Sequence, residues 1–191
     1  MRIVAGKFKG RTFRTKLPNS LRPTSDFTRE AIFNMLSNYI DLYETKVLDL
    51  FAGTGLLGFE ALSRGASFCH FVDKSRASSR IIQQNSDILD LPVNAYKITT
   101  SDVFSFLTTY NPVHTFDLVF SDPPYNLSLN SKVINHPKLK NLIHDGTIFV
   151  LETSNTETFD YPSEFVFHQR KDYGDTSISI LEFSISNKLK G

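Results

Sequence analysis

Residues 47–58 read VLDLFAGTGLLG. The apolar run at 47–51 predicts a short buried strand. Gly53, Gly55 and Gly58 follow it in a G-x-G-x-x-G pattern. Glycines in this position form a tight turn and let the backbone approach a bound nucleotide closely, so the stretch predicts a nucleotide-binding turn between a strand and a helix.

On both sides of this turn, strand and helix patterns alternate along the chain. After the first strand, further strands are expected at 69–72, 94–99, 116–120 and 147–151, and helices at 56–64, 76–89, 104–110 and, interrupted by Pro137, over 132–143. A closing pair of strands is expected at 165–169 and 177–183, around Tyr173-Gly174. This alternation predicts an α/β fold with a mostly parallel sheet and helices on both faces.

Acidic residues stand in or at the end of three consecutive predicted strands. The glycine pattern alone fits NAD, FAD or S-adenosylmethionine equally well. Asp49 favours the last of these, because a carboxylate inside the strand suits a cationic amino-acid end rather than a pyrophosphate. Asp73 is placed to bind ribose hydroxyls, Asp102 to accept from the adenine amino group, and Val103 to offer its backbone N–H to the ring.

The fourth predicted strand ends in Asp122-Pro123-Pro124-Tyr125. Two consecutive prolines make the turn stiff. A stiff turn fixes the Asp122 carboxylate and the Pro123 carbonyl as two acceptors, which suit the two hydrogens of an –NH₂ group. Held in this way, the amino group of a base can point its lone pair at a methyl donor, and Asp122 can take the released proton. Tyr125 offers an aromatic face on which a base turned out of its stack can lie.

Charge is unevenly distributed along the chain. Residues 1–29 carry eight basic residues and one acid, Asp26, which gives +7; because the whole chain carries +1, the remainder carries −6. Residues 2–16 predict two short strands about a Lys9-Gly10 turn, and a helix is expected from Ser25 or Asp26 to about Tyr39. The basic N-terminal end therefore suggests contact with a polyanion.

The composition excludes several classes of protein. The single cysteine, Cys69, forms no intrachain disulfide and no Cys-rich zinc site, and the five histidines show no metal spacing, so no metal is expected. No apolar stretch has the length of a signal peptide or of a membrane span. These features predict a cytoplasmic protein, and we expect it to be a monomer.

Taken together, these motifs resemble the class I, seven-stranded S-adenosylmethionine-dependent methyltransferases that act on amino groups. The N-terminal block narrows the resemblance: residues 1–6 with Gly10-Arg11, then Arg22-Pro23-Thr24 and residues 29–36 (REAIFNML) closely resemble the bacterial RsmD family. That family methylates N2 of one guanine in the 16S ribosomal RNA of the small subunit. The similarity covers about residues 1–183.

The resemblance implies two domains, a basic extension at 1–23 for RNA contact and a methyltransferase domain at 24–191. It implies 16S rRNA, or a partly assembled small subunit, as the partner. Acceptor-site residues would be Asp122, Pro123, Pro124 and Tyr125, and S-adenosylmethionine would be held by Asp49, Phe51, Ala52, Gly53, Thr54, Gly55, Asp73, Lys74, Asp102 and Val103. RNA phosphates would be held by Arg2, Lys7, Lys9, Arg11, Arg14 and Arg22.

The resemblance extends to several residues whose roles it does not define. Arg29, with Arg22 and Thr24, would border the cofactor or the RNA, and the Tyr173-Gly174 pair with Thr176 matches a family feature of unknown role. Asp73 stands where many relatives have Glu.

Two other functions compete with the guanine-N2 methyltransferase. The same acceptor corner could serve adenine N6 in DNA or RNA, or a glutamine side-chain amide. A non-catalytic RNA-binding or ribosome-assembly protein that kept the fold is the alternative of another class. The intact glycines and Asp122 argue against this non-catalytic alternative.

Overall fold

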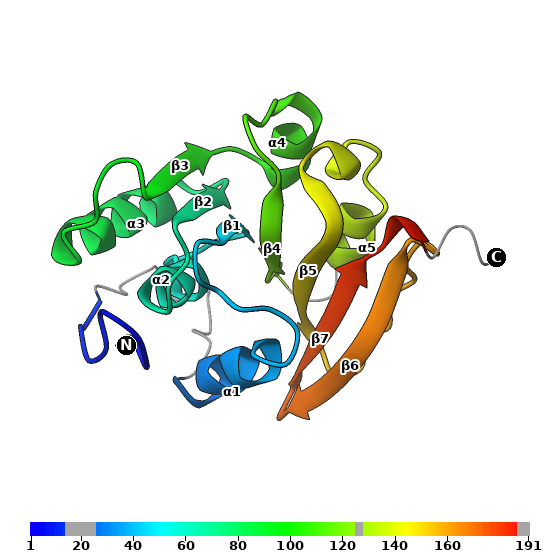
Figure 1. Ribbon diagram of the computed structural model, residues 1–191, viewed down its shortest axis with the longest axis horizontal. Helices are drawn as coiled ribbons and strands as arrows, with labels where there is room; N and C mark the ends of the chain where they lie inside the picture. Colours follow the sequence, from blue (N-terminus) through cyan, green and yellow to red (C-terminus); the bar gives the residue numbers. More distant parts are fainter. Residues whose placement is uncertain (14–25, 125–127, 187–191) are drawn as a thin grey trace.

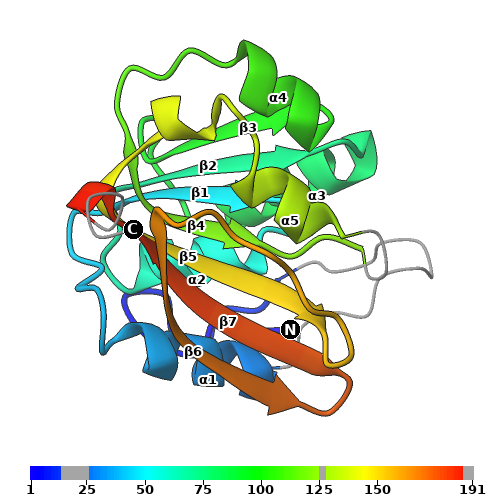
Figure 2. The same ribbon diagram turned by 90° about the vertical axis from the view of Figure 1, so that its right-hand side faces the viewer.

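The computed structural model describes residues 1–13, 26–124 and 128–186. At its centre is a seven-stranded sheet in the order β3-β2-β1-β4-β5-β7-β6. The strands are β1 (Lys46–Leu50), β2 (Phe68–Asp73), β3 (Tyr96–Thr100), β4 (Phe116–Ser121), β5 (Ile143–Ser154), β6 (Phe165–Tyr173) and β7 (Thr176–Phe183). β1 to β5 run parallel to one another, whereas β7 is antiparallel to both β5 and β6. Figure 2 shows this order from β3 to β6 across the sheet.

Helices cover both faces of the sheet, as the alternating pattern predicts (Figure 1). One face packs against α1 (Asp26–Leu36), α2 (Leu56–Ser63) and α3 (Arg76–Ile88). The other face packs against α4 (Val103–Thr109), α5 (Leu129–Ile134) and the 3-10 helix η1 (Leu139–Asn141). We call the first of these the α1–α2–α3 face. Pro137 separates α5 from η1, which is the interruption expected from a proline that cannot continue a helix.

Gly58 sets the distance between α2 and the sheet. A Cβ atom at this position would lie 2.3 Å from Phe71 Cε1 and 2.5 Å from Cys69 Sγ, both on β2. Cys69 and Phe71 are fully buried. Only glycine allows this close packing, so the third glycine of the pattern has a packing role and helps hold the glycine turn in place.

The pair of strands expected over residues 2–16 is not confirmed. Residues 1–13 contain one isolated antiparallel bridge, between Arg2 and Thr12, with the Ile3 N–H donating to the Arg11 carbonyl at 3.0 Å. The N–H groups of Val4 and Ala5 turn instead to the carboxylate of Glu60 on α2. A side chain thus takes the donors that a strand ladder would use. Residues 14–16, and the expected domain boundary at residue 23, lie outside the described ranges.

Candidate active site

The glycine turn after β1 has an unusual backbone. Phe51, Gly53 and Gly55 have φ angles of 59°, 56° and 78°. Left-handed φ is unfavourable for a phenylalanine, and strain of this kind, worth roughly 1–3 kcal/mol, concentrates at ligand sites. A Cβ built on Gly53 meets only one atom within 4 Å, the Phe51 carbonyl oxygen at 3.9 Å. The turn therefore presents bare backbone with open space beside it.

Asp73, at the end of β2, is tied to the glycine turn. Its Oδ2 accepts from the Gly53 N–H at 2.9 Å and its Oδ1 from the Ser75 N–H at 2.7 Å. Each carboxylate oxygen has a further lone pair, so these bonds fix the side chain without exhausting its capacity to accept. Lys74 beside it is exposed.

Asp102 caps a helix. Its Oδ1 accepts from the N–H groups of Phe104 and Ser105, at 3.0 and 3.1 Å, at the start of α4. The side chain is exposed, and Val103 next to it is the first residue of α4. The N–H groups in the first turn of a helix lack partners within the helix, so a ligand can use them. The adenine contact expected of Asp102 and Val103 stays a prediction.

Asp49 is a buried carboxylate in the centre of the sheet, only 2% exposed. Its Oδ2 accepts from the Gly58 N–H at 3.1 Å. Burial raises the pKa of Asp49 to about 8, against the lowering effect of the Gly58 hydrogen bond and with added repulsion from Asp73. A cationic ligand placed here would stabilise the charged form of Asp49.

The di-proline corner lies directly beside the glycine turn. Leu50 of β1 pairs with Ser121 of β4, so Asp122 begins the corner one strand away from the turn that starts at Phe51. Asp122 is partly buried, Pro123 is buried and Pro124 is exposed. Burial, then repulsion from Glu152 and Asp49, raises the pKa of Asp122 well above its usual range. The di-proline corner and the strand that leads into the glycine turn therefore share one electrostatic environment. Tyr125, expected to stack on the base, lies outside the described residues.

Glu152 belongs to this environment although the sequence did not indicate it. It lies on β5 and is 7% exposed. The predicted strand ended at residue 151, so Glu152 was not recognised as an acid near the end of a strand beside the di-proline corner. Asn130 of α5, 1% exposed, donates from Nδ2 to the Glu152 carbonyl at 2.7 Å and was also missed.

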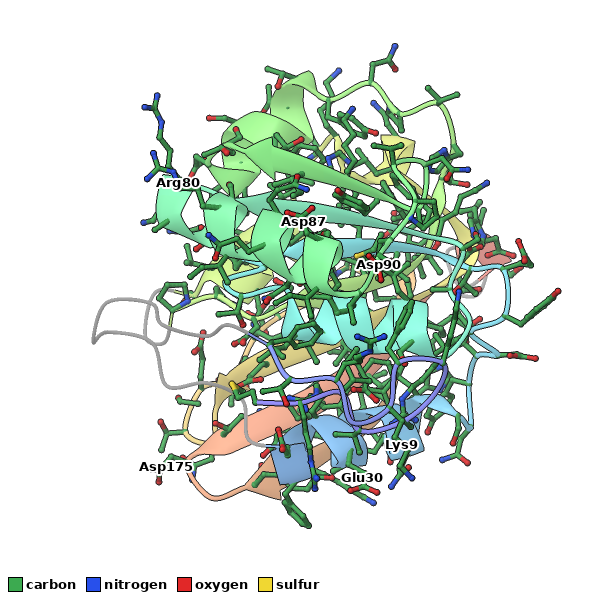
Figure 3. The ribbon with its side chains drawn as sticks, turned by 90° about the vertical axis from the view of Figure 1, so that its left-hand side faces the viewer. Lys9, Glu30, Arg80, Asp87, Asp90 and Asp175 are labelled. Atoms are coloured by element: carbon green, nitrogen blue, oxygen red, sulfur yellow. The ribbon has the colours of Figure 1, made fainter. Side chains whose placement is uncertain are left out.

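The basic N-terminal segment, residues 1–13, docks on α2 through the buried carboxylate of Glu60 and through Ser63, whose carbonyl accepts from the Lys7 N–H at 2.7 Å. Glu60 is fully buried; its Oε2 accepts from the Val4 N–H at 2.9 Å and its Oε1 from the Ala5 N–H at 3.0 Å. Arg64 Nε lies 2.9 Å from Glu60 Oε1, and Arg29 Nε lies 3.5 Å from Oε2. Figure 3 shows the segment lying between α2 and α1, with Lys9 and Glu30 at its outer side.

The cations of this segment remain at the surface. Arg2, Lys7, Lys9 and Arg11 are all exposed. Arg2 lies 3.8 Å from Asp26, and Lys7 Nζ lies 5.2 Å above the Phe8 ring. Two further residues expected to bind RNA, Arg14 and Arg22, lie outside the described residues, as does Thr24.

Arg29 does not fit the role expected of it. The side chain is fully buried, donates to the Arg2 carbonyl and to Asp26 Oδ1 at 2.9 Å, and pairs with Glu60. A guanidinium enclosed in this way has no surface to offer an RNA phosphate. Its contribution is to join α1, α2 and the N-terminal segment.

Within residues 1–13, 26–124 and 128–186, no group of three or more His, Cys, Asp or Glu side chains is placed to hold a metal ion. Among the helices of these same ranges, none combines the length and apolar character that a membrane span requires.

A sheet of this strand order, with a glycine turn after β1 and an acidic corner after β4, defines a class I, Rossmann-like methyltransferase. The family profile described as "Conserved hypothetical protein 95" matches residues 1–182, and the chain belongs to this family of RsmD-like methyltransferases.

Known proteins resemble the chain over nearly its whole length. Ribosomal RNA small subunit methyltransferase D of Escherichia coli (strain K12) is 30% identical over 183 residues, which cover 95% of this chain and 89% of that protein. The solved structure of yhhF from Escherichia coli matches with a TM-score of 0.83 at 29% identity, over 96% of this chain and 98% of that one. SMU.776, solved in complex with SAH, has a TM-score of 0.65 at 14% identity over 87% of this chain and 52% of that one, which shows the shared fold alone.

Proposed function

We propose that the protein transfers a methyl group from S-adenosylmethionine to the exocyclic N2 amino group of one guanine in 16S ribosomal RNA. The observation that carries the proposal is the adjacency of the glycine turn and the Asp122 corner, whose carboxylates Asp49 and Asp122 repel each other. A donor bound at the first and an amino group bound at the second would lie within reach of one another.

The chemistry of the glycine turn suits this donor. S-adenosylmethionine supplies a methyl group on a positively charged sulfur and carries an amino-acid ammonium group. The raised pKa values of Asp49 and Asp122 mark a site that favours a bound cation. The open side of Gly53 leaves room for a ligand against the backbone. Asp73 and Asp102, with the Val103 N–H, would hold the ribose and the adenine.

The acceptor corner suits an amino group. The Asp122 carboxylate and the Pro123 carbonyl would accept its two hydrogens and orient its lone pair, so that positioning supplies most of the acceleration. As the new N–CH₃ bond formed, the bond between the methyl group and the donor sulfur would break and the sulfur would leave as a neutral thioether. The amino nitrogen, made acidic by its new bond, would lose its proton to Asp122. A cation next to Asp122 lowers the pKa of this carboxyl and so keeps it ionised for both tasks.

Ribosomal RNA as substrate rests on two observations. The Escherichia coli relative that is 30% identical is named a ribosomal RNA small subunit methyltransferase. The N-terminal segment presents four exposed cations, which suit a chain of phosphates. We expect the substrate to be the rRNA or a partly assembled small subunit, and the active protein to be a cytoplasmic monomer.

The decisive experiment is incubation with labelled S-adenosylmethionine and small-subunit rRNA or subunits that lack the modification, followed by mapping of the labelled nucleoside. Label in N2-methylguanosine at one position is the expected result. Label in N6-methyladenosine, or in protein, would overturn the acceptor assignment. Calorimetric titration with S-adenosylmethionine tests the donor separately. A protein that only binds RNA would show no heat of specific binding to this cofactor.

A further inference from the structure

A second carboxylate stands next to Asp122 on the neighbouring strand. Ser121 of β4 pairs with Leu151 of β5, so the next positions along, Asp122 and Glu152, come side by side. Side chains two residues apart on a strand point to the same face. Phe120 and Val150 both belong to the core of the α1–α2–α3 face, which places Asp122 and Glu152 on that same face.

The position of Glu152 is well defined. Its side chain is 7% exposed, and the Asn130 amide holds its backbone carbonyl at 2.7 Å. Repulsion from Glu152 contributes to the raised pKa of Asp122, so the two carboxylates interact. Burying one carboxylate beside another is unfavourable for folding alone, and such pairs concentrate where a ligand is bound.

The corner at Asp122 does not explain which base is chosen. An –NH₂ group with two hydrogens occurs on guanine, adenine and cytosine, and all three could be held by a carboxylate and a carbonyl. The ring atoms next to that group differ: guanine has a donor, N1–H, on one side and an acceptor, N3, on the other, whereas adenine and cytosine have only an acceptor nitrogen. An ionised carboxylate only accepts, so a second one beside the first matches guanine and repels the other two bases.

We infer that Glu152 is a specificity-determining residue that accepts the N1–H of the target guanine while Asp122 and Pro123 hold its N2 amino group. This inference rests on the proposed function. It adds the residue that restricts the reaction to guanine, among bases that all carry a suitable amino group.

The test uses the full-length protein and rRNA that carries either guanosine or 2-aminopurine riboside at the nucleoside mapped for the natural substrate. 2-Aminopurine keeps the 2-amino group but has an acceptor nitrogen in place of N1–H. The wild type should prefer guanosine in kcat/KM by about 10- to 100-fold, the range expected for a hydrogen bond to a charged group. In Glu152→Gln, whose amide can either accept or donate, the preference should shrink to a few-fold.

Two further variants separate specificity from stability. Glu152→Asp keeps the charge but withdraws the oxygens by one methylene, so it should retain the preference for guanosine at reduced activity. It also provides a measurement if the Gln variant does not fold. Glu44→Gln makes the same substitution at an exposed side chain and should leave the preference unchanged.

The outcomes distinguish this inference from the proposed function. Equal methylation of both nucleosides by the wild type, or an unchanged preference in Glu152→Gln, would overturn the role of Glu152 and leave the proposed reaction intact. Absence of N2-methylguanosine from the natural substrate would overturn the proposed function itself.

Discussion

Asp122 is the residue on which the proposed chemistry depends. Asp122→Ala removes one of the two acceptors and the group that takes the proton, so methyl transfer should fall by at least about 100-fold. Binding of S-adenosylmethionine, measured by calorimetry, should stay within a few-fold of the wild type, since the glycine turn is untouched. Asp160→Ala removes an exposed acid and serves as the control. Unchanged turnover of Asp122→Ala would contradict the assigned role.

Asp49 makes the stability of the ligand-free protein depend on pH. Its pKa is about 8 in the folded protein against an ordinary value of 3.8, so the folded state holds a proton that the unfolded chain releases between these values. Stability from this group is therefore present below pH 4 and is lost as the pH rises towards 8, by up to about 1.4 kcal/mol per pH unit. Asp49→Asn cannot ionise and should gain stability relative to wild type between pH 6 and 8, as measured by urea unfolding. If the difference in unfolding free energy between Asp49→Asn and the wild type is the same at pH 6 and at pH 8, Asp49 does not titrate between these pH values.

Single residues were predictable where the geometry of a parallel sheet brings strand ends together. Asp49, Asp73, Asp102 and Asp122 follow from this rule, because each stands in or just after a strand with a clear apolar pattern. The place of Glu152 beside Asp122 was not predicted, because residues 152–154 continue β5 in a stretch without that apolar pattern. The burial of Arg29 was not predicted, because its partner Glu60 lies 31 residues away and the local sequence carries no signal for such a pair.

At the scale of elements, the parallel strands and their helices were predicted nearly as they occur, since alternating apolar patterns report on both. The two strands expected over residues 2–16 are not confirmed: residues 1–13 form one isolated bridge, between Arg2 and Thr12, and the Glu60 carboxylate takes the donors of Val4 and Ala5. No pattern within residues 2–16 reveals that a helix some 50 residues later offers an acceptor.

Glu60→Gln tests how firmly this segment is attached to α2. The amide keeps the shape of the side chain but loses its charge and brings N–H groups towards existing donors. Breaking a buried ion pair in this way should lower the free energy of unfolding by about 3 kcal/mol. Hydrogen exchange at the Val4 and Ala5 amides should accelerate more than exchange in β4. Glu44→Gln is the exposed control. If both variants unfold at the same urea concentration, the attachment of the segment through Glu60 does not stabilise the protein.

On the scale of the whole molecule, residues 1–29 carry a net charge of +7 and the remainder of the chain carries −6. Four exposed cations, Arg2, Lys7, Lys9 and Arg11, lie on the segment of residues 1–13, which α2 holds on the α1–α2–α3 face of the sheet (Figure 3). The strand register assigns Asp122 to this same face of the sheet. The docking of the segment could not be predicted from charge alone, because charge indicates a partner and not a position.

Replacing Lys7, Lys9 and Arg11 with Gln should weaken RNA binding and reduce the slope of log affinity against log salt by about 2 to 3, as expected for three lost phosphate contacts. Binding of S-adenosylmethionine should not change. The matched control replaces the exposed Lys97, Lys138 and Lys140, which lie away from this segment. If the salt slope equals that of the wild type, RNA contacts the protein elsewhere.

Cys69 gives the molecule a built-in chemical reporter. It is the one cysteine of the sequence, is fully buried on β2 against the position of Gly58, and has a pKa raised by burial and by Asp49. A thiol in this state reacts with alkylating reagents only when the centre of the sheet opens. The rate of alkylation should therefore measure that opening in unmodified protein, and a ligand that stabilises the glycine turn should slow it in proportion to its occupancy.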